Sequence, residues 1–422
     1  LENKNHRMSQ PAKHPKALPY LFFSEMWERF GYYLMIGIFL LYLKNVEHGF
    51  AMTNTEASDL YGTFIALVFL TPFIGGLLAD RYFGYRRSII AGGLMMGAGY
   101  CLMAVHSLPM LYLSMTLVIV GNGFFKPNIS TLLGNLYSTP AFEKRKDEGY
   151  NIFYMGINIG AFICNFFSTA IIIIWGWKYA FVAAGIGMFL GVIIFMAGTR
   201  HYASGDVKKP MTKEDMPFSR IVLTILFPSV IAGILGWMIP GNIFQSDSND
   251  AFIFACIPVI YFYSSLYFRA EKSEKRPIAA LLAIFAAVVL FWAVFKQNGS
   301  ALTIWADNYT NRHVTGEAAE VFNAVKLAEK KEFKKDSVVL YDNQFRIQKK
   351  NGVVLKEYDY PPYFKNVRPE ELPAANSQAT LWSTPLTQSI NPGWVILLTP
   401  LVIAFFAYLR RKGKEPSTPT KI

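Results

Sequence analysis

The sequence predicts an all-α protein that crosses a membrane many times. Of its 422 residues, 53% are hydrophobic and only 17% are charged, whereas about 25% of the residues in soluble domains are charged. Apolar runs recur that are long enough to cross a hydrocarbon core of about 30 Å as helices. Segments rich in lysine and arginine alternate with segments poor in both, which is typical of helices that run alternately up and down through a membrane.

The apolar runs define the helices in order. Six are expected near residues 18–43, 55–79, 86–106, 110–137, 150–174 and 177–198, two near 219–239 and 250–270, and two near 277–309 and 390–410. Lysine and arginine gather in the tail 1–17, in the loops 80–88, 140–149, 199–218 and 270–276, and after residue 410. Because such loops stay in the cytoplasm, both chain ends are expected there. The net charge of +12 is explained by these loops in a lipid bilayer and needs no nucleic-acid partner.

The segment 310–388 is polar and of mixed charge, and we expect it to be a small extracytoplasmic insertion. Its stretch KLAEKKEFKKD, residues 326–336, is expected to form a short solvated helix. Alternating strand-like runs then surround Asn351-Gly352, a pair that favours a hairpin turn. A solvated spacer is the simplest role for this insertion.

Cysteine and histidine usage indicates neither a metal site nor an enzyme. Cys101, Cys164 and Cys256 all lie inside apolar runs, and their spacing matches neither a metal site nor a disulfide framework. His106 stands alone near a helix end. No nucleophile–base pair occurs in the spans, and no signal peptide precedes the first one. We therefore expect no enzymatic activity, no metal and no cofactor.

The first span carries charged residues where lipid contact would be costly. Glu25, Glu28, Arg29, Tyr32 and Tyr33 follow an i, i+3, i+4, i+7, i+8 spacing, which places them on one helix face. Because charges inside a membrane are expensive, this face is expected to line a cavity. The alternative is a charge cluster that fixes helix packing near the interface.

Two later spans also carry polar residues. Lys126 lies about two-thirds along its span and is followed by Pro127, which bends helices; a cavity-facing role is favoured over a lysine that reaches the interface. Asn158 lies between Gly156 and Gly160, where a packing contact and a ligand contact are both open.

The ninth span carries Lys296 and Gln297 in the middle of an apolar run. A lysine at that depth needs a carboxylate partner or a water-filled cavity. Glu25 and Glu28 are the obvious candidates for that partner.

The stretch GGLLADRYFGYRR between the second and third spans resembles the loop signature of major facilitator transporters. Its glycines allow close helix approach, and its charges can lock one face of the bundle through ion pairs and helix ends. The expected gating-loop residues are Asp80, Arg81, Arg86 and Arg87.

Five stretches together resemble the proton-dependent oligopeptide transporter family. They are EMWERFGYY, GNGFFKPNIS, FYMGINIGAF, FKQNGSALT and QSINPGWVILLTP. The resemblance implies a major facilitator fold with an N-terminal six-helix bundle over 18–200, two additional helices within 219–270, and the first two helices of a C-terminal bundle at 277–309 and 390–410. We expect the natural protein to continue past residue 422 with the remaining helices of that bundle.

The resemblance also implies a function: symport of protons with di- and tripeptides by alternating access, in the inner membrane of a bacterium. It implies that the proton-coupling residues are Glu25, Glu28, Arg29 and Lys126, and we expect Lys296 to take part with them. It implies that the substrate-binding residues are Arg29, Tyr32, Tyr33, Lys126, Asn158 and Asn391. We expect Phe69, Trp292 and Gln297 to line the same site. Protons are the only coupling ion expected, and the oligomeric state is not predicted.

Three positions depart from the family pattern. Many members have an arginine at Ile36 and a glutamate at Lys296, and these two are thought to pair across the halves; here that pair cannot form, and Lys296 is expected to face Glu25 and Glu28 instead. Phe69 stands where many members have a tyrosine.

Two alternatives to this function remain. One is a transporter of another small anionic or zwitterionic solute on the same fold, such as nitrate or a drug-like acid; the other is a non-coupled channel or receptor.

Overall fold

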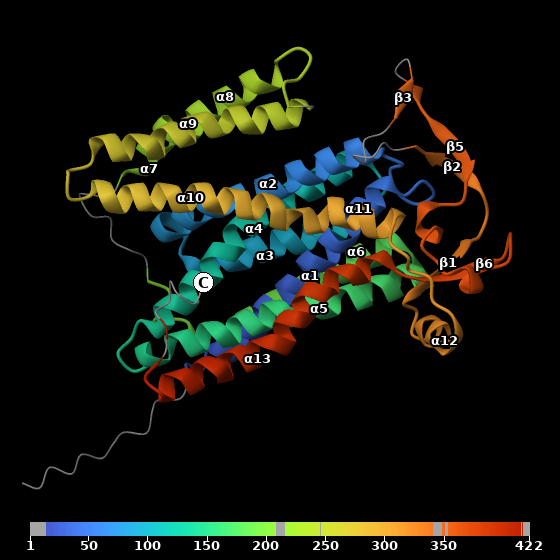
Figure 1. Ribbon diagram of the computed structural model, residues 1–422. Helices are drawn as coiled ribbons and strands as arrows, with labels where there is room; N and C mark the ends of the chain where they lie inside the picture. The colour runs from blue at the N-terminus through green and yellow to red at the C-terminus, as the bar shows by residue number, and fades with distance from the viewer. Residues whose placement is uncertain are drawn as a thin grey trace, which may run out of the picture.

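The N-terminal part of the chain is a six-helix bundle (Figure 1). The computed structural model describes residues 14–207, 216–244, 246–340, 348–350, 353–414 and 416. The bundle helices are α1 (Leu18–Lys44), α2 (Asn54–Leu78), α3 (Tyr85–Leu102), α4 (Leu108–Tyr137), α5 (Lys146–Trp175) and α6 (Trp177–Ala197). In the bundle α1 packs against α5 and α6, and α3 packs between α4 and α6. The predicted all-α membrane fold is confirmed.

Eight helical segments in the described part of the chain are long and apolar enough to cross a membrane. Two further helices, α1 and α3, lie in the same bundle but are less apolar. The polar residues of α1 include Glu25, Glu28 and Arg29, and α3 begins next to Arg86.

A separate helical hairpin follows the bundle. It consists of α7 (Phe218–Ile221), a π-helical stretch over Val222–Leu226, α8 (Phe227–Trp237) and α9 (Asp247–Arg269), and it lies beside α10 in Figure 1. At the start of α9, the Ser246 and Ser248 hydroxyls donate to the two carboxylate oxygens of Asp59 in α2, at 2.6 and 2.9 Å. These two hydrogen bonds tie the hairpin to the bundle.

The ninth span is broken in the middle. The sequence predicts one helix over 277–309, but α10 (Lys275–Phe295) passes into a 3-10 turn over Lys296–Gly299 and resumes as α11 (Ala301–Asn308). At the break, Gly299 lies so close to Tyr61 of α2 that a Cβ atom there would be 2.0 Å from the tyrosine hydroxyl. The last helix, α13 (Ile390–Arg411), follows a 3-10 stretch over Thr384–Ser389.

Among its described residues, the insertion between α11 and α13 contains one α-helix and three pairs of short strands. The helix is α12 (Gly316–Ala324), and the strands are β1 (Ala328–Glu332), β2 (Asp336–Val339), β3 (Lys349–Lys350), β4 (Val353–Val354), β5 (Lys356–Asp359) and β6 (Gln378–Trp382). β1 pairs antiparallel with β6, β2 with β5, and β3 with β4.

The helix expected over residues 326–336 is wrong. Residues 328–332 form β1 instead, because their backbone pairs with β6 about fifty residues later, from Ala328 opposite Trp382 to Glu332 opposite Gln378, and such tertiary pairing overrides local propensity. The expected turn at Asn351-Gly352 lies outside the described residues.

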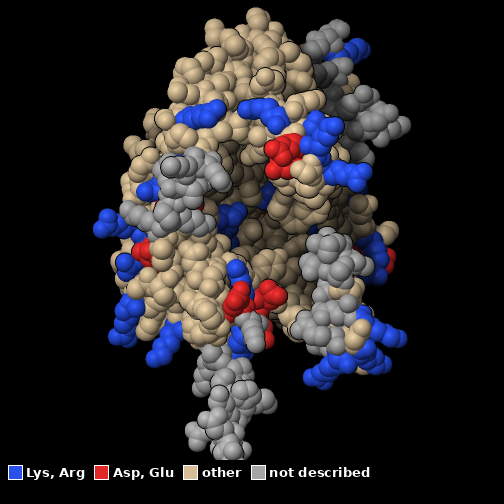
Figure 2. Space-filling model, turned by 90° about the vertical axis from the view of Figure 1, so that its left-hand side faces the viewer, with Lys and Arg blue, Asp and Glu red and all other residues tan. Residues whose placement is uncertain are grey.

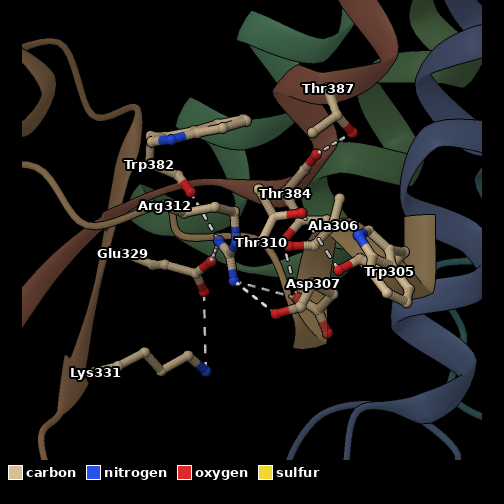
Figure 3. A network of polar contacts seen from close by, with 10 residues as sticks. All are labelled: Trp305, Ala306, Asp307, Thr310, Arg312, Glu329, Lys331, Trp382, Thr384 and Thr387. Atoms are coloured by element: carbon tan, nitrogen blue, oxygen red, sulfur yellow. Dashed lines mark hydrogen bonds and ion pairs between the residues drawn. The ribbon is translucent and has the colours of Figure 1, made fainter. Parts of the chain in front are cut away.

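Arg312 anchors the insertion to the membrane helices (Figure 3). Its side chain is 1% exposed and donates to the Glu329 carboxylate in β1 and to the Trp382 carbonyl in β6, both at 2.7 Å. It also forms an ion pair with Asp307 of α11 at 3.5 Å, and Asp307 accepts a 2.8 Å hydrogen bond from Thr384. The buried guanidinium of Arg312 thus contacts α11 and both strands directly. Asp307 in turn connects α11 to the segment before α13.

One end of the molecule is basic and hollow. Figure 2 shows this end, where lysine and arginine side chains surround a recess. The turn between α9 and α10 and the C-terminal end of α13 lie at this end (Figure 1). The insertion lies at the opposite end.

Candidate functional site

The charged residues of α1 form a compact ionic cluster inside the bundle. The Nε atom of Arg29 lies 3.0 Å from Glu25 Oε1 and is also in contact with Glu28 Oε2. The three side chains are between 0% and 4% exposed. The helical spacing read from the sequence therefore brings both carboxylates to one guanidinium.

Glycines on the neighbouring helices keep this cluster away from lipid. A Cβ atom at Gly160 of α5 would lie 2.3 Å from the Met26 carbonyl of α1, and one at Gly191 of α6 would lie 3.0 Å from the Ser24 carbonyl. The Ser24 hydroxyl in turn donates to the Gly191 carbonyl at 2.9 Å. Backbone therefore packs on backbone on two sides of α1, as small residues permit in membrane helices.

Part of the cluster has no hydrogen-bond partner in the described part of the chain. The buried atoms without one include Glu25 Oε2, Glu28 Oε1 and Arg29 Nη2. A buried polar atom without a partner costs about 1–3 kcal/mol, so such atoms mark places where a proton, a water molecule or a polar ligand gains most by binding.

Aromatic residues continue from the cluster along α1. The Arg29 guanidinium carbon lies 5.4 Å from the centroid of the Tyr32 ring, within the range of a cation–π contact. The Tyr33 ring meets Tyr32 edge-on at 5.4 Å. Tyr32 is buried and Tyr33 partly buried.

Two lysines from different helices converge on one aromatic ring. The Nζ atoms of Lys126 in α4 and Lys296 at the end of α10 lie 4.6 and 4.1 Å from the centroid of Phe69 in α2. The nitrogens are therefore at most 8.7 Å apart (4.6 plus 4.1 Å). Like charges at that separation repel by about 2 kcal/mol at an effective dielectric constant of about 20. The Trp292 ring lies 5.0 Å from Lys296 Nζ and 6.1 Å from the Phe69 ring.

The expected pairing of Lys296 with Glu25 or Glu28 does not form. In the described part of the chain, neither Lys296 nor Lys126 makes an ion pair with a carboxylate, and Lys296 instead lies on Phe69 and Trp292. The packing of α10 directs its side chain to α2 rather than to α1. α1 also packs against α4 and against the 3-10 turn that carries Lys296, so the lysine pair and the α1 cluster lie in adjoining parts of the same group of helices.

The other residues expected to contact the substrate make no described hydrogen bond with the α1 cluster. Asn158 is 7% exposed and donates to the Tyr154 carbonyl of its own helix at 2.9 Å, a contact that leaves both roles expected from the sequence open. Gln297 and Asn391 are exposed, and no described hydrogen bond joins their side chains to the α1 cluster.

The expected gating loop begins as a π-helical extension of α2 over Ala79–Phe83, at the basic end of the bundle. Arg81 donates to the Met216 carbonyl at 2.8 Å. Arg86 forms an ion pair with Asp206 at 2.5 Å, and Arg87 lines the same surface pocket as both. The sequence did not single out Asp206, which follows α6 in a loop with no motif of its own.

A second set of polar contacts missed from the sequence joins the first bundle to the helices that follow. The Ser389 hydroxyl donates to the Phe162 carbonyl of α5 at 2.7 Å and accepts from Asn165 at 3.1 Å. Gln388 donates to the Asn298 carbonyl at the α10–α11 break, at 2.8 Å. In the sequence, Asn165 could have pointed to these contacts, because it is a polar residue inside an apolar run.

The helical topology and the candidate spans define this protein as a polytopic helical membrane protein with a buried ionic site. The sequence profile described as POT family (PTR2) matches residues 86–327, and the chain belongs to this family.

Individual relatives agree with that assignment. The uncharacterized transporter YclF of Bacillus subtilis (strain 168) is 33% identical over 318 residues, which cover 73% of this chain and 64% of YclF. A di-/tripeptide transporter of Lactococcus lactis subsp. lactis (strain IL1403) is 30% identical over 309 residues, which cover 70% of this chain and 62% of that protein. The chain thus spans somewhat less than two-thirds of the length of these relatives.

The fold matches solved structures as well. The crystal structure of the peptide transporter POT in complex with sulfate aligns with a TM-score of 0.67 at 27% identity, covering 98% of this chain and 73% of that one. A POT family transporter in complex with 5-aminolevulinic acid aligns with a TM-score of 0.68 at 23% identity, covering 96% of this chain and 72% of that one.

Proposed function

We propose that this protein is a proton-coupled symporter that imports di- and tripeptides across the cytoplasmic membrane of a bacterium. The observation that carries the proposal is the buried Glu25–Glu28–Arg29 cluster, whose carboxylate and guanidinium atoms are only partly satisfied. The family membership and the peptide transporter from Lactococcus lactis support the same substrate class.

A site for many peptides must bind the groups that all peptides share. The peptide carboxylate suits Arg29, whose guanidinium offers two parallel donors, and Lys126. Asn158 and Asn391 suit amide and terminal groups of the peptide. Tyr32 and Tyr33 add hydroxyl groups and apolar ring faces that adapt to different side chains.

Coupling follows from the ion pairs of Arg29. When both glutamates are ionised, their charges hold the guanidinium within the cluster. Protonation of Glu25 or Glu28 removes one of these partners and leaves Arg29 with positive charge to offer a substrate carboxylate. Release of the peptide and proton to the cytoplasm lets the ion pair form again. Each positive charge that moves inward gains about 2.3 kcal/mol per 100 mV of membrane potential.

The test is the variant Glu28→Gln, assayed by uptake of a labelled dipeptide into proteoliposomes. We expect it to lose accumulation driven by a proton gradient and to keep exchange of labelled for unlabelled peptide, because exchange needs no net proton movement. The matched control is Glu47→Gln, since the Glu47 side chain is 84% exposed in the loop after α1.

Retained uphill uptake in Glu28→Gln would reject the coupling role of that residue. No competition by any dipeptide against labelled substrate in the unmodified protein would reject the peptide substrate and favour another small solute.

A further inference from the structure

The proposed coupling mechanism gives a role to Arg29 and Lys126 but leaves Lys296 without one. Arg29 is the cation that exchanges partners in that mechanism, and Lys126 is available for one substrate carboxylate. Lys296 then has no role: it is held by Phe69 and Trp292 alone and makes no ion pair with a carboxylate in the described part of the chain.

The arrangement of the two lysines is specific. They come from α4 and α10, which are more than 100 residues apart in the sequence, and both ammonium groups lie on the ring of Phe69 from α2. Aromatic rings attract cations without neutralising them. Phe69 therefore holds two mutually repelling charges close together and leaves both able to bind an anion.

The aromatic residues of the cluster are more exposed than its lysines. Phe69 is 40% exposed and Trp292 is 42% exposed, while both lysines are partly buried. The two lysines are thus held between helices without being fully buried, and a charge-assisted hydrogen bond there is stronger than in water.

We propose that the Lys126–Phe69–Lys296 cluster is a dianion subsite, so that the protein prefers peptides that carry a second acid group in a side chain. This inference rests on the proposed peptide transport. Lys126 and Arg29 take the terminal carboxylate of the peptide, and Lys296 takes the carboxylate of an acidic side chain, with Trp292 against its methylene groups.

The charge balance supports this assignment. With one glutamate protonated, the α1 cluster is neutral overall, and the two lysines give the site a charge of about +2. A zwitterionic dipeptide adds no net charge, whereas a peptide with an acidic side chain brings one negative charge and a basic one brings a further positive charge. Acidic peptides are therefore favoured and basic peptides disfavoured.

The experiment is inhibition of labelled Ala-Ala uptake by unlabelled Ala-Glu, Ala-Gln and Ala-Lys at one pH and one ionic strength. Ala-Glu and Ala-Gln have nearly the same shape, so the ratio of their inhibitory concentrations isolates the second carboxylate. In the unmodified protein we expect Ala-Glu to inhibit at a concentration about tenfold lower than Ala-Gln, and Ala-Lys to be the weakest.

Variants of Lys296 test whether the preference for Ala-Glu over Ala-Gln comes from this subsite. Lys296→Gln is expected to reduce the Ala-Glu to Ala-Gln ratio to about twofold or less, and Lys296→Arg to retain it. The ratio is measured within one variant, so it does not depend on how much of that variant folds. The control is Lys178→Gln, because Lys178 also lies over an aromatic ring, Tyr179, at 4.9 Å, but belongs to α6, away from the Phe69 cluster.

Each outcome separates this proposal from the proposed function. Equal inhibition by Ala-Glu and Ala-Gln in the unmodified protein overturns the dianion subsite and leaves peptide transport in place. An acidic preference that survives in Lys296→Gln overturns the role of Lys296. Inhibition by none of the three dipeptides overturns the proposed function and the subsite together.

Discussion

At the residue scale, a single hydrogen atom on Gly160 decides how closely α5 approaches the ionic cluster. A Cβ atom there would lie 2.3 Å from the Met26 carbonyl, 3.0 Å from the Phe30 nitrogen and 3.3 Å from the Arg29 Cβ atom. Backbone atoms cannot rotate away as a side chain can. The closeness that buries Arg29 and its two glutamates therefore depends on this glycine.

We expect Gly160→Ala to lower the free energy of unfolding by about 1–3 kcal/mol, because α5 must move away from α1 to admit the methyl group. The measurement is thermal or denaturant unfolding of the purified protein in detergent. Gly62→Ala is the matched control: nothing lies within 4 Å of a Cβ atom there, and alanine favours a helix over glycine. Equal loss of stability in both variants would contradict this account.

At the element scale, the insertion is fixed to the transporter helices by few but buried contacts. Arg312 is almost fully buried, while its partners Glu329 and Asp307 are 29% and 31% exposed. Asp307 ends α11, and Thr384, which donates to it, begins the segment that leads into α13. The insertion is therefore attached to α11 and to the segment that precedes α13.

We expect Arg312→Met to release the insertion from α11. Removing one partner of a buried ion pair costs about 3 kcal/mol, at the low end of the usual range since the carboxylates here are partly exposed. Limited proteolysis and hydrogen exchange should show faster cleavage and exchange within residues 310–388. Arg368→Met is the control, because the Arg368–Glu371 pair is exposed and such pairs contribute little. Unchanged protection in Arg312→Met would refute the anchoring role.

At the scale of the whole molecule, the two ends differ. One end is hollow and basic (Figure 2), and the other carries the insertion and the Ser389 contacts between α13 and α5. Because lysine and arginine favour the cytoplasmic side, we propose that the hollow end faces the cytoplasm. The hollow end would then open to the cytoplasm.

This orientation predicts which sites a membrane-impermeant maleimide can reach. A cysteine at Ser337, exposed in β2, should react in intact cells. A cysteine at Lys412, exposed after α13, should react only after the cells are permeabilised. The parent protein with Cys101, Cys164 and Cys256 gives the background. The reverse pattern of labelling would place the insertion in the cytoplasm.

Much of the fold could be predicted from the sequence because helix length and apolar content are local properties. The first span, expected over 18–43, is observed over Leu18–Lys44, and the polar face of that helix follows from spacing alone. The break at Lys296–Gly299 and the strand β1 could not be predicted, because each depends on a partner far away in the sequence: Tyr61 for Gly299 and β6 for β1.

The same division holds for the site. The sequence by itself determined that Glu25, Glu28 and Arg29 share one helix face, since 3.6 residues per turn fixes that relation before any packing. Only the tertiary structure decided where the Lys296 ammonium lies, because the aromatic rings that it contacts belong to α2 and α10 rather than to α1. The packing of the helices decides which charged residues of different helices come together. The residues that determine this packing are spread over the whole chain.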